Sequence, residues 1–297
     1  MIISASYRTD IPAFYGRWFM KRLQEGVCTV ENPWNRRTYT VDLTAETVDG
    51  FVFWTRNLRP FITHLSVIKS RAPFVVQYTV TNYPRILDAG TPSAEHAVDD
   101  IRKIARQYGQ SAVVWRYDPI VISSLTPFEW HIRNFGTLSR RLAGAVDEVI
   151  VSFAHFYRKT KRNLVHAAAE HSFSFEDPTP FQKHALMDEL SKISTAYGMK
   201  LCVCSQPENV VDNVGVASCI DANRLSRVGN GNTSAPVKGN RPGCMCHASR
   251  DIGAYNTCPH GCVYCYAVDN RYQTKIRHRE HDHAGTSLVG NARGNRQ

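Results

Sequence analysis

The chain has 297 residues, of which 43% are hydrophobic and 21% charged, a composition that supports a large buried core and excludes a disordered chain. Its formal net charge is +10, so it attracts polyanions such as nucleic acids, or small acidic metabolites. The amino terminus is too short and polar for a signal peptide, and no apolar run has the length of a membrane span. The sequence therefore predicts a cytoplasmic protein without a membrane partner.

Six apolar, β-branched runs alternate with helical patterns along the first two thirds of the chain. The predicted strands cover residues 1–7, 51–55, 74–81, 111–117, 148–154 and 200–206. The predicted helices begin after Asp10 and near Pro60, Ser93, Pro127, Lys161 and Pro180. Six strand–helix repeats favour a parallel α/β domain over residues 1–206 with right-handed crossovers.

Polar residues stand at or just after the carboxyl ends of these strands. In parallel α/β barrels the chemistry collects at the carboxyl ends of the strands, so five of these residues are candidates for contacts to substrate or cofactor: Arg8, Asp10, Arg56, Arg116 and Asp118. The arginines are favoured because a guanidinium fork matches carboxylate and phosphate. Ordinary helix caps and rim salt bridges are the alternative, with Asp10 a plain N-cap.

The chain has nine cysteines, and in a reducing cytosol they point to metal ligation rather than to disulfides. Cys258, Cys262 and Cys265 form a C-x3-C-x2-C motif, with Tyr264 just before the third. Three thiolates bind three corners of a 4Fe-4S cluster and leave the fourth iron open, and an open iron can bind S-adenosylmethionine. Zinc is the alternative, although zinc sites favour paired C-x2-C units and four ligands.

This motif resembles the signature of the radical SAM superfamily, C-x3-C-x-aromatic-C. The segments ISASYRTDIP (3–12) and CPHGCVYC (258–265) together resemble an uncharacterised family that carries them at opposite ends of the chain, and the cluster loop is similar to that of spore photoproduct lyase. The superfamily resemblance implies a (β/α)6-type partial TIM barrel. It also implies that Tyr264 or its backbone helps to seat the adenine of S-adenosylmethionine. Most members carry the motif near the amino terminus, whereas here it lies near the carboxyl terminus.

Residues 207–270 read as a cluster-binding segment on the mouth of the barrel. Four further cysteines there and at the end of the sixth strand supply the ligands of a second, fully ligated 4Fe-4S cluster: Cys204, Cys219, Cys244 and Cys246. Cys202 competes with Cys204 for this place, since the two point alike on an extended strand. A structural zinc ion is again the alternative.

Residues 271–297 are basic and predict a flexible tail that could contact nucleic-acid phosphates. The sequence thus predicts a radical SAM enzyme of the isomerase or lyase type, in which a 5′-deoxyadenosyl radical removes hydrogen from the substrate. The favoured substrate is a modified thymine base in DNA, and the expected electron donor is a flavodoxin or ferredoxin. A small-molecule or peptide substrate is one alternative, and a non-enzymatic, zinc-stapled nucleic-acid-binding protein is another.

Overall fold

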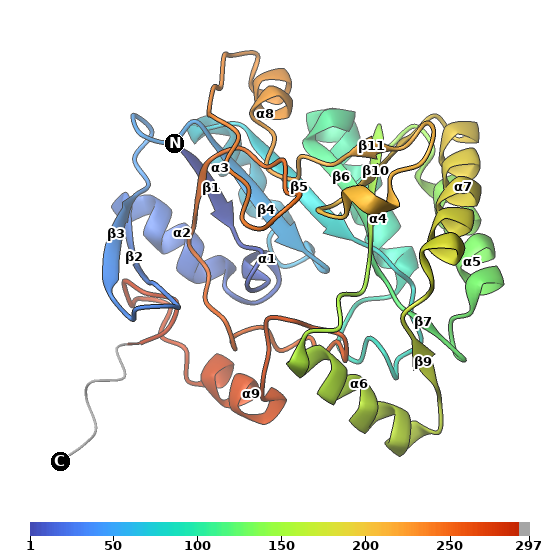
Figure 1. Cartoon of the computed structure of the whole chain (residues 1–297). Helices are drawn as coiled ribbons and strands as arrows, with labels where there is room; N and C mark the ends of the chain where they lie inside the picture. The colour runs from blue at the N-terminus through green and yellow to red at the C-terminus, as the bar shows by residue number, and fades with distance from the viewer. Residues whose placement is uncertain (291–297) are drawn as a thin grey trace.

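The computed structural model describes residues 1–290, and an eight-stranded sheet forms the centre of the fold (Figure 1). The sheet has the spatial order β11-β10-β8-β6-β5-β4-β1-β12, and every neighbouring pair is parallel. Its strands are Ile2–Ala5 (β1), Gly50–Thr55 (β4), Phe74–Thr79 (β5), Val113–Ile120 (β6), Glu148–Phe153 (β8), Lys200–Val203 (β10), Gly215–Val216 (β11) and Ser249–Asp251 (β12). The six predicted strands correspond to β1, β4, β5, β6, β8 and β10, so the prediction of a parallel α/β fold is confirmed.

Helices follow the strands at the six predicted places. The helices are Ile11–Phe14 (α1), Gly16–Glu25 (α2), Leu65–Arg71 (α3), Ala94–Tyr108 (α4), Phe128–Leu142 (α5), Arg158–His171 (α6), Pro180–Ala196 (α7), Ala222–Gly229 (α8) and Arg271–Arg279 (α9). Two of them, α8 and α9, were not predicted. Short 3-10 turns occupy Ile62–His64, Gln110–Ala112 and Pro207–Asn209. The helix expected after Asp10 is divided in two at Tyr15, and the Asp10 carboxylate accepts from the backbone N–H of Ala13 as the predicted N-cap.

Two antiparallel ribbons lie outside the main sheet. One pairs Val27–Glu31 (β2) with Thr38–Asp42 (β3), and the other pairs Ile122–Ser123 (β7) with Phe175–Glu176 (β9). Neither ribbon was predicted from the sequence, because their strands are short or largely exposed and carry a weak apolar alternation.

The two faces of the central sheet are covered by different parts of the chain. One face packs against α2, α4, α5 and α7 and forms the largest hydrophobic core, in which Phe53 and Trp115 are fully buried. On the other face Val52, Val114 and Ile150 pack against residues of the segment 217–246, including Leu225 of α8 (Figure 1). The cysteine-rich segment therefore fills one face of the sheet, a position that burial of apolar area stabilises.

The segment that the sequence assigned to a flexible tail contains helix α9. Beyond α9 the chain returns to the body of the protein. There the Trp18 indole N–H donates to the carbonyl of Gly285 at 3.0 Å, and Ser287 forms an isolated parallel β-bridge with Thr29. Residues 291–297, the rest of the predicted tail, lie outside the described residues. No helix within residues 1–290 is both long and apolar enough to cross a membrane.

Candidate functional site

The motif cysteines lie on the loop that follows β12, at the end of the sheet where the parallel strands finish. Cys258, Cys262 and Cys265 line one small pocket of about 10 Å³, together with Asn163 of α6 and Arg271 of α9. This volume holds about one water molecule. The loop thus brings its three thiols to a common space, and no other cysteine lines that space.

Burial dominates the chemistry of these thiols. It raises the pKa of Cys258, of Cys262 and of Cys265, because a thiolate loses its hydration inside the protein. The three side chains are therefore neutral at neutral pH until a metal replaces their protons. Among residues 1–290, no group of three or more His, Cys, Asp or Glu side chains is arranged as it stands to hold a metal ion.

The loop is fastened to the first strand–helix junction through His260. The His260 Nε2 atom lies 2.8 Å from the Asp10 carboxylate, and Nδ1 lies 3.1 Å from the carbonyl oxygen of Gly90. The Asp10 Oδ2 atom, which contacts His260, also accepts from the backbone N–H of Arg56 at 2.7 Å. The other oxygen, Oδ1, caps α1. Asp10 is thus both the predicted cap and an anchor of the cysteine loop.

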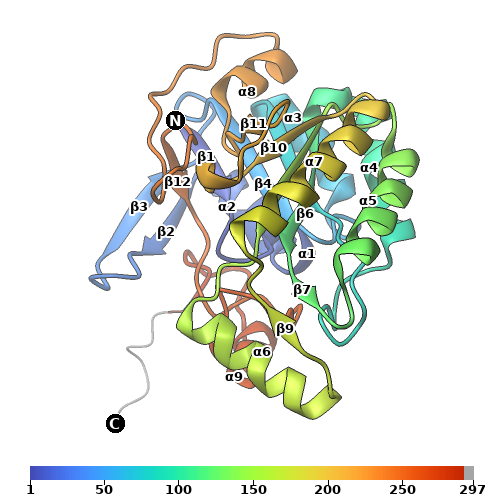
Figure 2. The same cartoon turned by 45° about the vertical axis from the view of Figure 1, so that its right-hand side comes forward.

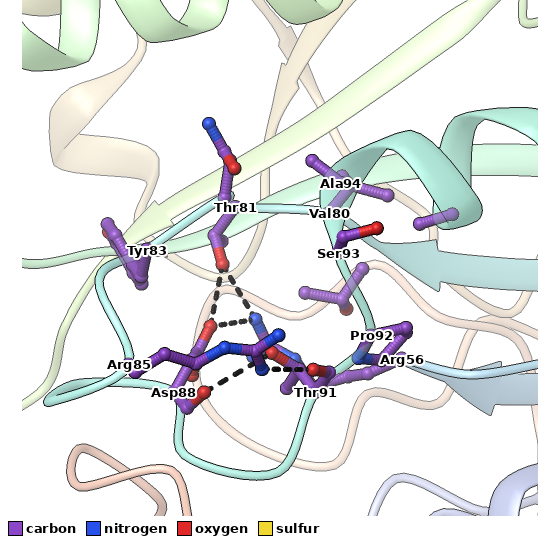
Figure 3. A pocket seen from close by; sticks show the side chains of 13 residues that line it. Arg56, Val80, Thr81, Tyr83, Arg85, Asp88, Thr91, Pro92, Ser93 and Ala94 are labelled. Carbon is purple, nitrogen blue, oxygen red and sulfur yellow. Dashed lines mark hydrogen bonds and ion pairs between the residues drawn. The ribbon is translucent and has the colours of Figure 1, made fainter.

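A second anchor joins Tyr264 to the ends of β4 and β5. The Arg56 guanidinium donates to the Tyr264 hydroxyl at 2.6 Å, and to Thr81 and Asp88 at 2.6 Å each. The Tyr264 hydroxyl donates in turn to Asp88. Figure 3 shows Arg56, Thr81 and Asp88 meeting in a pocket of about 150 Å³ beside the start of α4. Since Tyr264 is buried and its hydroxyl is engaged, its side chain fixes the loop in place.

A third anchor holds β12, which leads into the loop. Asp251 accepts from the Arg8 Nε at 2.9 Å and from the Ser4 and Ser6 hydroxyls at 2.9 and 2.6 Å. The backbone N–H groups of Tyr7 and Gly253 donate to the same carboxylate at 3.1 and 2.9 Å. Burial opposes the charge of Arg8, but Asp251 outweighs it and raises the pKa of the guanidinium. The Arg8 guanidinium therefore forms a buried ion pair with Asp251.

The four remaining candidate cysteines converge where β10 ends. The Cys219 thiol lies 3.4 Å from the sulfur of Cys204, and the backbone N–H of Ile220 donates to Cys246 at 3.4 Å. A hydrogen bond from Cys246 lowers the pKa of Cys244 to about 5. The contact to Cys219 is made by Cys204, just after β10, while Cys202 lies two residues earlier, within β10. We call Cys204, Cys219, Cys244 and Cys246 the four-thiol group.

Two guanidinium groups contact the four-thiol group. Arg116 donates to the Cys219 sulfur at 3.0 Å, and Arg241 donates to the Cys204 sulfur at 3.6 Å. Arg116 also binds Asp118, whose other oxygen accepts from Ser152. Arg116 and Asp118 are thus brought together as a pair beside these sulfurs, and neither lines the pocket of Cys258, Cys262 and Cys265.

Residues 2–267 match the family described as a domain of unknown function, DUF1848. The chain belongs to the DUF1848 family. No curated protein and no solved structure matches it. The family match covers the motif cysteines, the four-thiol group and the three anchors, and it ends before α9.

Sequence reasoning missed three residues of these anchors, Asp88, Asp251 and His260, and it missed Arg241 beside the four-thiol group. His260 and Asp251 stand within or just before the cysteine motif, so their position was a usable signal. Asp88 lies in a loop without periodic pattern, and only the fold shows that it meets Arg56.

The donor set fits a cluster with one open iron. Three thiols of one loop face one space, and among the residues lining it the only other metal-binding side chain is His260, whose two ring nitrogens are already held by Asp10 and Gly90. The space holds only about one water molecule, so it must widen to hold a cluster.

Proposed function

We propose that this DUF1848 protein is a radical SAM enzyme that binds a 4Fe-4S cluster through Cys258, Cys262 and Cys265. When bound with S-adenosylmethionine, such a cluster supplies the electron that generates a 5′-deoxyadenosyl radical, which removes hydrogen from the substrate. The observation that carries the proposal is the convergence of three motif thiols, and no fourth, on one space at the carboxyl end of the sheet.

The arrangement of the strands supports a (β/α)6-type partial TIM barrel. β1, β4, β5, β6, β8 and β10 are neighbours in chain order, as in a parallel barrel, where catalytic groups gather at the carboxyl ends. Within residues 1–290 the edge strands β11 and β12 do not pair with each other, so the proposed barrel is an open one.

The chain's own residues have positioning roles in this proposal. Asp10 holds His260, and Arg56 with Asp88 holds Tyr264, so both halves of the cysteine loop are fixed to the sheet. A preorganised loop keeps the open coordination position aimed at one place, which a radical reaction requires because a misplaced radical attacks the protein.

For the four-thiol group we propose a second, fully ligated 4Fe-4S cluster. Four thiols leave no open position, so this site would transfer electrons or staple the segment 217–246 to the sheet rather than bind S-adenosylmethionine. Arg116 and Arg241 would offset the negative charge of four thiolates.

The proposed substrate is a modified thymine base in DNA, rearranged or cleaved outside the duplex, and the proposed electron donor is a flavodoxin or ferredoxin. The net charge of +10 supports a polyanionic substrate. A base must leave the stack to reach an enclosed site, as in other base-modifying enzymes.

Anaerobic purification followed by iron, sulfide and zinc analysis tests the proposal. The expected protein is brown, holds about eight irons per chain if both sites carry cubane clusters, and releases 5′-deoxyadenosine from S-adenosylmethionine under reduction. Replacement of Cys258, Cys262 and Cys265 by Ala should abolish 5′-deoxyadenosine and leave the four-thiol metal in place.

The matched control is Cys28→Ala, which removes a buried thiol of β2 outside both groups and should keep all iron. A colourless protein containing zinc alone would reject the enzyme and favour the zinc-stapled binding protein. Retained 5′-deoxyadenosine formation in the triple variant would reject the ligand assignment.

A further inference from the structure

The densest positive charge of the chain lies on α6 and α9. The two helices carry eight Lys or Arg and one acid, Glu170, a contribution of +7 to the net charge of +10. By contrast, α4 carries three Lys or Arg and three acids, so its net charge is zero. The excess charge of the protein is therefore concentrated rather than spread over its surface.

These two helices border the pocket of the motif cysteines. Asn163 of α6 and Arg271 of α9 line that pocket, and Arg162 and Lys159 both bind Asp269, which lies two residues before α9. Figures 1 and 2 both place α6 and α9 at the same end of the molecule, beyond the carboxyl ends of the strands. The positive charge thus lies beside the pocket of the three thiols.

Most of this charge is available to a partner. Within residues 1–290, seven of the eight cations of the two helices are exposed and form no ion pair with the carboxylate of an Asp or Glu: Arg158, Lys161, Arg162, Arg271, Lys275, Arg277 and Arg279. Their field is weakened only by solvent and salt, so it draws in polyanions.

We propose that α6 and α9 form a phosphate-binding surface that holds a nucleic acid with one nucleotide at the cysteine pocket. α6 has 14 residues and is about 21 Å long, which matches about six phosphates along one strand of duplex DNA. Five of the eight cations are arginines, whose planar fork suits phosphate better than the ammonium of lysine does.

Tyr272 adds a surface for a base. It lies on α9 among the cations and is 70% exposed, and an exposed aromatic ring within a basic surface stacks on unpaired bases. An acidic protein would use the same charge but has no need of such a ring. The inference rests on the proposed function in one respect, which is that the chemistry at the thiols explains why a nucleotide is held there. The binding of nucleic acid itself needs no cluster.

The test compares two variants with equal net charge. The first replaces four cations of the proposed surface by Gln: Arg158, Lys161, Arg277 and Arg279. The matched control replaces four exposed cations of α4 and α5 by Gln: Lys103, Arg106, Arg133 and Arg140. Both chains carry a formal charge of +6, which is +10 less four. Binding of a fluorescent duplex and of a single-stranded oligonucleotide is measured over a range of salt concentrations, with the full-length, anaerobically purified protein.

The surface variant should lose at least about tenfold in affinity at low salt, and the slope of log K against log salt should become shallower by about 3 to 4, since each phosphate contact contributes about 0.9. The control should stay within about twofold of the wild type. Equal losses in both variants, or no loss in either, would overturn the inference. So would a surface variant that keeps DNA binding but no longer binds an acidic redox protein such as a flavodoxin.

The two proposals fail separately. A chain that binds DNA through this surface but holds no iron keeps the present inference and loses the radical SAM proposal. A chain that holds iron and cleaves S-adenosylmethionine but binds no oligonucleotide keeps the radical SAM proposal and loses the present inference.

Discussion

Replacing Asp251 by Ala should destabilise the protein more than any other single change at the candidate site. Arg8 and Asp251 side chains are each 6% exposed, and the substitution leaves the Arg8 charge buried without its partner. It also removes the acceptor of the Ser4 and Ser6 hydroxyls and of two backbone N–H groups. Breaking one side of a buried ion pair costs about 3–5 kcal/mol. For a chain of this size that loss lowers the melting temperature by roughly 5–8 °C.

Urea unfolding followed by circular dichroism measures this loss, and a double-mutant cycle with Arg8→Met isolates the pair. Arg8→Met alone should cost less, because Asp251 keeps its other four donors. The double variant should be about 2–3 kcal/mol more stable than the sum of the single losses predicts. Glu189→Ala, which breaks an exposed ion pair with Lys192, should leave the midpoint unchanged. Additive single effects, or a loss below about 1 kcal/mol for Asp251→Ala, would show that the pair does not hold β12.

Three further changes test the loop and its surroundings. Tyr264→Phe should cost about 1–3 kcal/mol and lower iron retention, measured by chelator challenge, because it leaves Asp88 and Arg56 without the hydroxyl. Gly90→Ala should cost about 1–3 kcal/mol in thermal melts, since the added Cβ would stand 2.7 Å from the carbonyl oxygen of His260. As the control, Gly136→Ala inside α5 should stabilise the protein by about 0.5–1 kcal/mol. Burial lowers the pKa of His131 from 6.5 to about 4, so stability should be complete above pH 6.5 and fall by about 3 kcal/mol towards pH 4, a slope that His131→Gln should remove.

Local patterns predicted the strands and most helices because burial imposes periodicity on every segment that packs against the sheet. Helix starts were equally predictable: α4 begins directly after Ser93, α7 begins at Pro180, and Asp10 caps α1 as expected. Helix α9 escaped prediction because its sequence, RYQTKIRHR, has one aliphatic residue and no apolar face, and of its residues only Thr274 is buried.

The partners of the predicted rim residues were beyond sequence reasoning. Arg8 was expected to contact a ligand, yet its carboxylate partner Asp251 lies 243 residues later in the chain. No local pattern specifies a pairing at that separation. Strand β12, with the sequence Ser-Arg-Asp, has no apolar residue, so its place beside β1 also follows only from the three-dimensional fold.

The place of β12 bears on why the cysteine motif can stand so late in the chain. β12 pairs with β1 at the edge of the sheet, so in space the order reads β12, β1, β4, β5, and the loop carrying Cys258 follows the first strand of that order. A motif that stands late in the chain therefore lies beside the first strands of the sheet, as the proposed function requires. Asp251, at the end of β12, makes this junction specific by binding Arg8 at the end of β1. Chain order and spatial order differ at this one edge, and the chemistry of a site depends on the spatial order.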